Sequence, residues 1–229
     1  MLPLKPYWLI FYQQIGICYG YFHAKMDSRC CPVEGELIME KTALLIIDMQ
    51  YDFCLPEAPF AVKGALQVVP QIKKALAAYR HRGLPVVHVV RRYRADGVDV
   101  EITRLQAFQE KGGAFIAGTK GARIIEELKP VKGEYVVIKR RWSAFFQTEL
   151  DLLLGRLGVN HIVVTGVQTP NCIRSTVWDG NSLDYQVTVL SDGTGAADPA
   201  VHRANLFDMQ NIGVQLLTAD ELISRLHKK

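Results

Sequence analysis

The sequence predicts an α/β domain in which helices cover both faces of a six-stranded, mostly parallel sheet, giving three layers. Short apolar runs alternate with helical segments along the chain, as in a series of right-handed βαβ units. The chain has 229 residues, enough for one such domain with a short extension. Hydrophobic residues make up 49% and charged residues 22% of the chain. This balance allows a packed core and excludes wholesale disorder.

The predicted strands are continuous apolar runs, because a strand inside a parallel sheet is buried on both faces. The first run ends in a carboxylate, Asp48, and the third run is followed by Lys139. The six predicted strands cover residues 42–48, 84–90, 135–138, 161–165, 186–190 and 214–217.

Helical spacing of apolar residues fills most of the intervals between these strands. In the first helix Ile72, Leu76 and Tyr79 share one face, and Gly83 ends the helix. Residues 112–121 are predicted to be a loop. The predicted helices cover residues 68–82, 122–128, 148–157, 172–183, 199–211 and 219–226.

The first 39 residues have a different character from the rest. Residues 7–22 are apolar and aromatic, but two glutamines interrupt them, and they are fewer than the ~20 apolar residues that a spanning helix needs. No small-residue cleavage site follows, as a signal peptide would require, and Cys30 and Cys31 lack the partners of a zinc site. We therefore expect a poorly ordered extension over residues 1–39, or residues upstream of the true start, with the domain over residues 40–229.

Charge and cysteine content exclude several function classes. The net charge of +4 is mild and its basic residues are dispersed, which argues against a nucleic-acid partner. Five cysteines are an odd number and do not indicate a disulfide framework, so we expect a reducing, cytoplasmic compartment and no membrane partner. No glycine-rich phosphate loop follows a predicted strand, which argues against a nucleotide-binding protein.

Three reactive side chains follow predicted strands. Asp48, Lys139 and Cys172 come after the first, third and fourth strands, and in parallel sheets the reactive site lies beyond the carboxyl ends of the strands. A lone cysteine is more often a small buried hydrophobic residue. Here a turn at residues 169–171 precedes Cys172 and an amphipathic helix follows it. The helix N-terminus and Lys139 would favour a thiolate at Cys172, and Asp48 could accept the proton of the thiol.

The segments that carry these residues also occur together in a known family. They are LLIIDMQ at residues 44–50, VIKRRWSAFF at residues 137–146 and TGVQTPNC at residues 165–172. In this order and spacing they resemble the isochorismatase-like cysteine hydrolase superfamily, over about residues 41–226. That superfamily includes nicotinamidases, N-carbamoylsarcosine amidase and ureidoacrylate amidohydrolase.

The resemblance implies roles for particular residues. It implies a nucleophile at Cys172, an acid/base at Asp48 and a supporting cation at Lys139. It also implies a cis peptide bond between Val167 and Gln168, with the backbone amides of Gln168 and Cys172 forming an oxyanion hole.

Arg91 leaves the second predicted strand beside this site, at the start of the basic run 91–94. Its guanidinium group could hold a substrate carboxylate in a bidentate arrangement. The alternatives are a solvated basic loop, or an internal ion pair with Asp99 or Glu101.

Aromatic residues near the site suggest a substrate pocket. Trp142 and Phe145 follow Lys139, whereas Phe146 is expected in the core. The candidate substrate-binding residues are Arg91, Trp142, Phe145, Gln50 and Phe53.

The sequence offers no metal site of the nicotinamidase kind. Nicotinamidases of the superfamily hold a metal with an aspartate and two histidines just beyond the second strand, but residues 91–99 contain no histidine. His88 lies inside the apolar strand, where we expect a core histidine. We therefore expect no metal and no cofactor.

Together these features predict a cofactor-independent cysteine hydrolase that cleaves a C–N bond of a small amide or ureido compound through a thioester, and that forms a homo-oligomer. Two alternatives remain open. One is a nicotinamidase, and the other is a catalytically silent protein of the same fold that only binds a partner.

Overall fold

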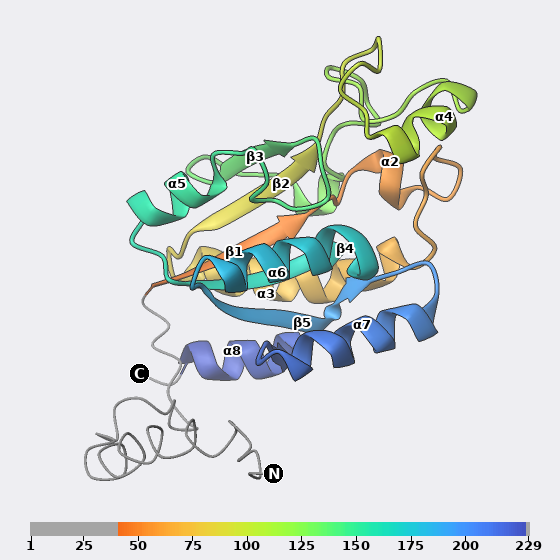
Figure 1. Cartoon of the computed structure of the whole chain (residues 1–229). Coiled ribbons are helices and arrows are strands. Elements are labelled where there is room, and N and C mark those ends of the chain that lie inside the picture. Colours follow the sequence, from red (N-terminus) through yellow and green to blue (C-terminus); the bar gives the residue numbers. More distant parts are fainter. Residues whose placement is uncertain (1–40, 228–229) are drawn as a thin grey trace, which may run out of the picture. The chain divides into compact units, whose positions relative to one another are not determined.

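The computed structural model describes residues 41–227 (Figure 1). The expectations for the extension over residues 1–39 and for Cys30 and Cys31 lie outside the described residues. None of the helices within the described part is long and apolar enough to cross a membrane.

A six-stranded sheet forms the middle layer, and all six predicted strands are confirmed. Each pair of neighbouring strands is parallel, so the sheet is entirely rather than mostly parallel. Its strands, in the order β3-β2-β1-β4-β5-β6, are β1 (Thr42–Ile47), β2 (Val86–Arg91), β3 (Tyr135–Lys139), β4 (His161–Val167), β5 (Gln186–Gly195) and β6 (Gln215–Leu217).

The strand order reverses between β1 and β4. From β1 the chain builds outward through β2 and β3, then crosses back to start β4 on the other side of β1. In such sheets ligands bind beyond the carboxyl ends of the strands at this switch point. Helices α2 and α4 and the connection from β2 to β3 lie at this edge of the sheet (Figure 1).

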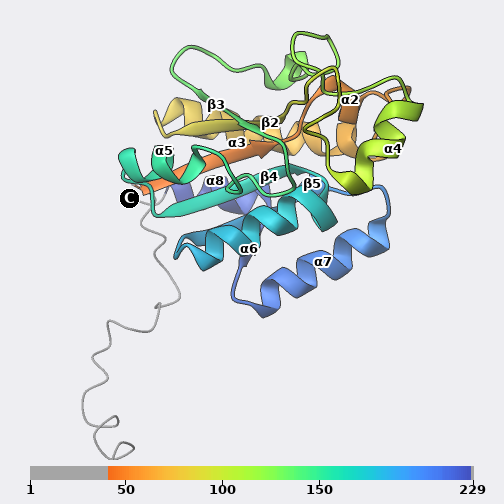
Figure 2. The same cartoon turned by 45° about the horizontal axis from the view of Figure 1, so that its top comes forward.

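Helices cover both faces of the sheet, as predicted. Helices α5, α6 and α7 cover one face, and α3 and α8, which contact each other, cover the other (Figures 1 and 2). The helices are α2 (Tyr51–Cys54), α3 (Val69–His81), α4 (Ile102–Glu110), α5 (Leu150–Arg156), α6 (Arg174–Ser182), α7 (Pro199–Asn211) and α8 (Ala219–His227). Short helical turns lie at η3 (Ala65–Val68), η4 (Glu126–Leu128) and η5 (Thr169–Ile173).

Besides the four-residue helix α2, which was not predicted, two segments differ from the helix predictions. The helix expected over residues 122–128 is only the turn η4, because Ile124 pairs with Gln50 in an antiparallel bridge and the backbone before η4 is extended. Helix α4 was not predicted, because the usual pattern of buried apolar and exposed charged residues is partly reversed in it. Its first residue, Ile102, is 92% exposed, while Arg104 and Phe108 are buried.

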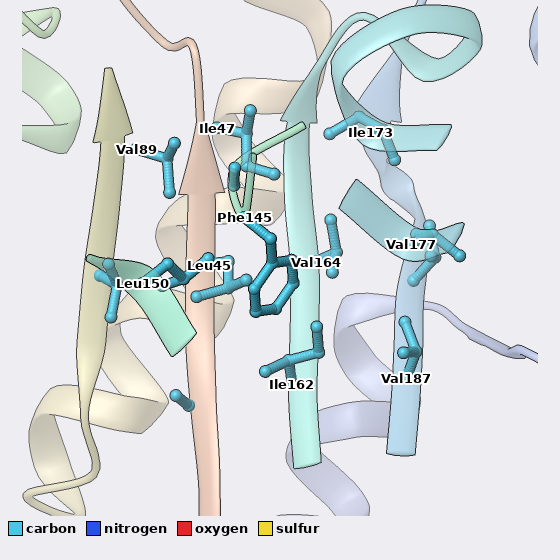
Figure 3. Packing of buried hydrophobic residues seen from close by; sticks show 14 of the residues in the cluster. Leu45, Ile47, Val89, Phe145, Leu150, Ile162, Val164, Ile173, Val177 and Val187 are labelled. Carbon is cyan, nitrogen blue, oxygen red and sulfur yellow. The ribbon is translucent and has the colours of Figure 1, made fainter. Parts of the chain in front are cut away.

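The core beneath α5 and α6 contains Phe145. Its ring lies among Leu45, Ile162 and Val164 (Figure 3) and stacks on Tyr185, with ring centres 5.5 Å apart. The next residue, Phe146, is 50% exposed. The expectation of a core position for Phe146 is therefore wrong, because this residue lies at the surface. Phe145 packs in the core, and its expected role in substrate binding stays a prediction.

Candidate active site

Asp48 follows β1 at the switch point and is fully buried. Its backbone has φ 58°, a conformation that aspartate tolerates better than most residues. The Asp48 amide donates to the Val89 carbonyl at 2.8 Å, which ties the end of β1 to β2.

Lys139, at the end of β3, reaches across β2 to Asp48. Its Nζ atom lies 2.8 Å from Asp48 Oδ2, and both side chains are fully buried. Nζ also donates to the Arg141 carbonyl at 3.2 Å. The Oδ1 atom of Asp48 is buried and accepts no hydrogen bond. The ion pair therefore leaves a carboxylate oxygen available at the sheet edge.

Cys172 lies in the turn η5, which runs directly into α6. The thiol is buried, and the Cys172 carbonyl accepts from Thr176 Oγ1 at 2.6 Å. The peptide bond between Val167 and Gln168, just before this turn, is cis, which confirms that expectation. The side chain thus sits at the start of a helical segment after β4.

Arg91 links the Cys172 thiol to residues in the segment between β2 and β3. Its Nη2 atom lies 3.5 Å from Cys172 Sγ and 3.0 Å from the Arg141 carbonyl, which accepts from it. Its Nη1 atom donates to Glu101 and to Tyr93. Of the two internal partners considered, Glu101 is therefore the counter-charge of Arg91.

The charged side chains around Arg91 stabilise one another. Burial lowers the pKa of Arg91, but the neighbouring Cys172, Asp48, Tyr93 and Glu101 groups raise it well above its usual value. Burial raises the pKa of Glu101, but Arg91 and the Tyr93 hydroxyl hold it below its usual value. The other acid, Asp99, instead accepts from Arg140 Nε at 2.9 Å and from the Arg94 amide at 2.9 Å.

Gln50 and Phe53 have structural contacts. The Gln50 amide donates to the carbonyls of Arg91, at 2.9 Å, and Ala122, at 2.8 Å, and accepts from the Arg91 amide at 2.7 Å. Both N–H donors of Gln50 are thus used by backbone carbonyls, and its expected role in substrate binding stays a prediction. Phe53 is buried with its ring centre 4.3 Å from that of Phe115.

Trp142 is half-buried at the site, as its position after Lys139 suggested. The guanidinium carbon of Arg91 lies 5.3 Å from the centre of the Trp142 ring, and that of Arg104 lies 4.8 Å from it. Sequence reasoning named Glu101 as a possible partner of Arg91 but missed Tyr93 and Arg104. A charged residue on a short helix such as α4 gives no signal that it is buried.

The residues after β2 do not fit a nicotinamidase-type metal site. Arg91 occupies the end of the strand, and the carboxylates of the following loop pair with arginines, Asp96 with Arg94 and Asp99 with Arg140, each at 2.9 Å. His88 is buried with Nε2 2.8 Å from Glu134 Oε2, which confirms it as a core histidine. Over residues 41–227, no three His, Cys, Asp or Glu side chains converge as a metal site requires.

Comparison with known proteins decides the family. The isochorismatase domain model matches residues 42–221. The chain belongs to the isochorismatase family.

Members of the isochorismatase family from distant organisms are similar over most of the chain. A "probable inactive nicotinamidase" from Arabidopsis thaliana is 46% identical over 79% of this chain and 93% of its own length. The ureidoacrylate amidohydrolase of Pantoea ananatis is 34% identical over 70% of this chain and 71% of its own length. The crystal structure of an isochorismatase family protein from Desulfovibrio vulgaris superposes with a TM-score of 0.79 at 47% identity, over 82% of this chain and 99% of that one.

Proposed function

We propose that this isochorismatase-family hydrolase is a cysteine amidohydrolase, which cleaves a C–N bond of a small amide or ureido compound through a thioester. One arrangement carries the proposal. The buried Lys139 and Asp48 side chains form an ion pair 2.8 Å apart, and Arg91 approaches the Cys172 thiol to 3.5 Å. These groups meet at the switch point of the sheet, where the fold places ligands.

The reaction would proceed in two halves. Cys172 Sγ attacks the substrate carbonyl carbon while its proton passes to Asp48, and Asp48 then protonates the leaving nitrogen as the C–N bond breaks. Water next attacks the thioester and gives a proton to Asp48, and the departing sulfur takes that proton back. The products are the acid, or carbamate, and the amine or ammonia. The backbone amides of Gln168 and Cys172 are the proposed donors to the tetrahedral oxyanion.

Two cations have separate parts in this scheme. Lys139 lies against Asp48 and would hold that carboxylate in place and balance its charge until it receives the proton. Arg91 lies against the sulfur and would favour the thiolate that attacks. We propose a supporting role for Arg91 rather than substrate binding, since its charge is already matched by Glu101.

The test is release of ammonia from a panel of small amides and ureido compounds, including nicotinamide. We expect turnover of at least one compound by the full chain and none by Cys172→Ala. Cys54→Ala is the matched control, because Cys54 is also buried but its pKa is raised to about 12, chiefly by burial, so it should not react. Turnover that survives Cys172→Ala would assign the nucleophile elsewhere.

A catalytically silent binding protein is the second candidate. The description of the Arabidopsis relative as a probable inactive nicotinamidase favours it. For this candidate the panel compounds would raise the melting temperature without any release of ammonia. Nicotinamidase activity is less well supported, because arginines stand where metal ligands would be needed. A cytoplasmic location and assembly as a homo-oligomer complete the proposal.

A further inference from the structure

Arg104 carries a buried charge that the proposed mechanism does not use. It lies in the first turn of α4, and only 8% of the residue is exposed. Its Nη1 atom is buried and has no hydrogen-bond partner. A guanidinium N–H that is removed from water normally needs an acceptor, because a buried charged donor without one is unfavourable.

The carboxylates around Arg104 are already used. Glu101, one helical turn earlier, pairs with Arg91 and accepts from the Tyr93 hydroxyl. Asp99 pairs with Arg140. Within residues 41–227, no carboxylate lies in ion-pair contact with Arg104.

The surroundings of Arg104 connect it to the nucleophile. Its guanidinium carbon lies 4.8 Å from the centre of the Trp142 ring and 5.0 Å from that of Phe60. The same Trp142 ring lies 5.3 Å from the guanidinium carbon of Arg91, which in turn contacts Cys172. Arg104 therefore shares an aromatic wall with the candidate active site.

The charges of the site are unbalanced. Three buried cations, Lys139, Arg91 and Arg104, face two buried carboxylates, Asp48 and Glu101. A thiolate at Cys172 would lie beside Arg91 and not beside Arg104, so Arg104 would still have no close partner. The Nε atom of Arg91 is also buried without an acceptor. Unused donors of this kind point to an anionic ligand.

We propose that Arg104 binds a carboxylate of the substrate, so that the protein selects small amide or ureido compounds that carry an acid group. The inference rests on the proposed function for the position of the scissile bond. Trp142 and Phe60 would hold the guanidinium group of Arg104 in place, and Arg104 would receive the anionic end of the substrate.

The experiment measures binding to the full chain carrying Cys172→Ala, so that it does not depend on turnover. The probes are three acids, malonamate, succinamate and ureidoacetate, each paired with the neutral analogue in which a methyl group replaces the carboxylate: propionamide, butyramide and ethylurea. By calorimetry we expect at least one acid to bind at least about tenfold more tightly than its neutral analogue. Adding Arg104→Gln should weaken the binding of that acid by roughly tenfold to a hundredfold. The affinity for the neutral analogue should change by less than about twofold.

Arg104→Lys is the matched variant, because it keeps the charge but loses the planar fork. We expect it to retain part of the preference for the acid. Three results would overturn the inference: no preference for any acid before Arg104 is changed, equal losses for acid and neutral probes, or a preference that Arg104→Gln leaves intact. Acid binding that depends on Arg104 in a chain that hydrolyses no substrate would support the site while refuting the proposed catalysis.

Discussion

The Nζ atom of Lys139 lies 2.8 Å from Asp48 Oδ2, although β2 separates the strands that carry these two residues. The pair therefore spans three strands at the carboxyl edge of the sheet. Because both side chains are fully buried, each charge depends on the other.

Asp48→Asn should abolish ammonia release and also destabilise the fold by about 3–5 kcal/mol, since it leaves the Lys139 charge buried without a partner. The double variant Asp48→Asn with Lys139→Met should recover much of this stability in urea unfolding but no activity. If the double variant were no more stable than Asp48→Asn alone, the two charges would not be coupled.

Arg91 and Glu101 should shift the reactivity of Cys172 in opposite directions. Arg91→Met removes the cation beside the sulfur and should slow the reaction of Cys172 with an electrophile. Glu101→Gln removes the negative charge that opposes Arg91 and should speed this reaction. The rate of Cys172 alkylation by iodoacetamide at a fixed pH, followed by mass spectrometry of that peptide, measures both effects. Arg94→Met, at an exposed arginine, is the control. Equal alkylation rates in all variants would show that Arg91 does not influence the thiol.

Gly166→Ala should destabilise the protein by at least about 3 kcal/mol. Gly166 has φ 109°, and a Cβ there would lie 2.0 Å from the Ile47 carbonyl oxygen, where β1 and β4 meet beside the site. Gly155→Ala, in α5, is the matched control. A Cβ at Gly155 meets nothing within 4 Å, so this change should stabilise the helix by about 0.5–1 kcal/mol. Similar effects at the two glycines would contradict the close approach of the strands.

Phe145→Ala and Phe146→Ala should differ sharply in urea unfolding. Phe145 is packed between the sheet and its covering helices, so its truncation should cost about 3–5 kcal/mol. Phe146 is 50% exposed, and its truncation should change the free energy of unfolding by less than about 0.5 kcal/mol. If Phe146→Ala cost more stability than Phe145→Ala, Phe146 rather than Phe145 would be the core residue.

His161 should make stability fall as the pH is lowered. Burial lowers its pKa from 6.5 to about 4 in the folded protein. Below pH 6.5 the unfolded chain therefore binds a proton that the folded chain does not. The free energy of unfolding should drop by about 3 kcal/mol between pH 6.5 and pH 4 from this group alone. His161→Gln should remove this part of the pH dependence, whereas His81→Gln, at an exposed position, should not. An unchanged slope in His161→Gln would refute the assignment.

The sequence by itself determined the layered fold and the positions of the three candidate catalytic residues. The strands are buried on both faces, so they appear as continuous apolar runs whatever their neighbours. Parallel strands end at one edge, so Asp48, Lys139 and Cys172 had to gather there once the strands were recognised.

Only the tertiary structure decided how the remaining side chains are used. Neighbouring residues of one chemical type, such as Phe145 and Phe146, differ only in which faces the sheet. Glu101 rather than Asp99 pairs with Arg91, and Arg104 is buried, because the connection after β2 folds α4 over the sheet edge. These outcomes depend on contacts between residues far apart in the chain, and the local sequence pattern does not indicate such contacts.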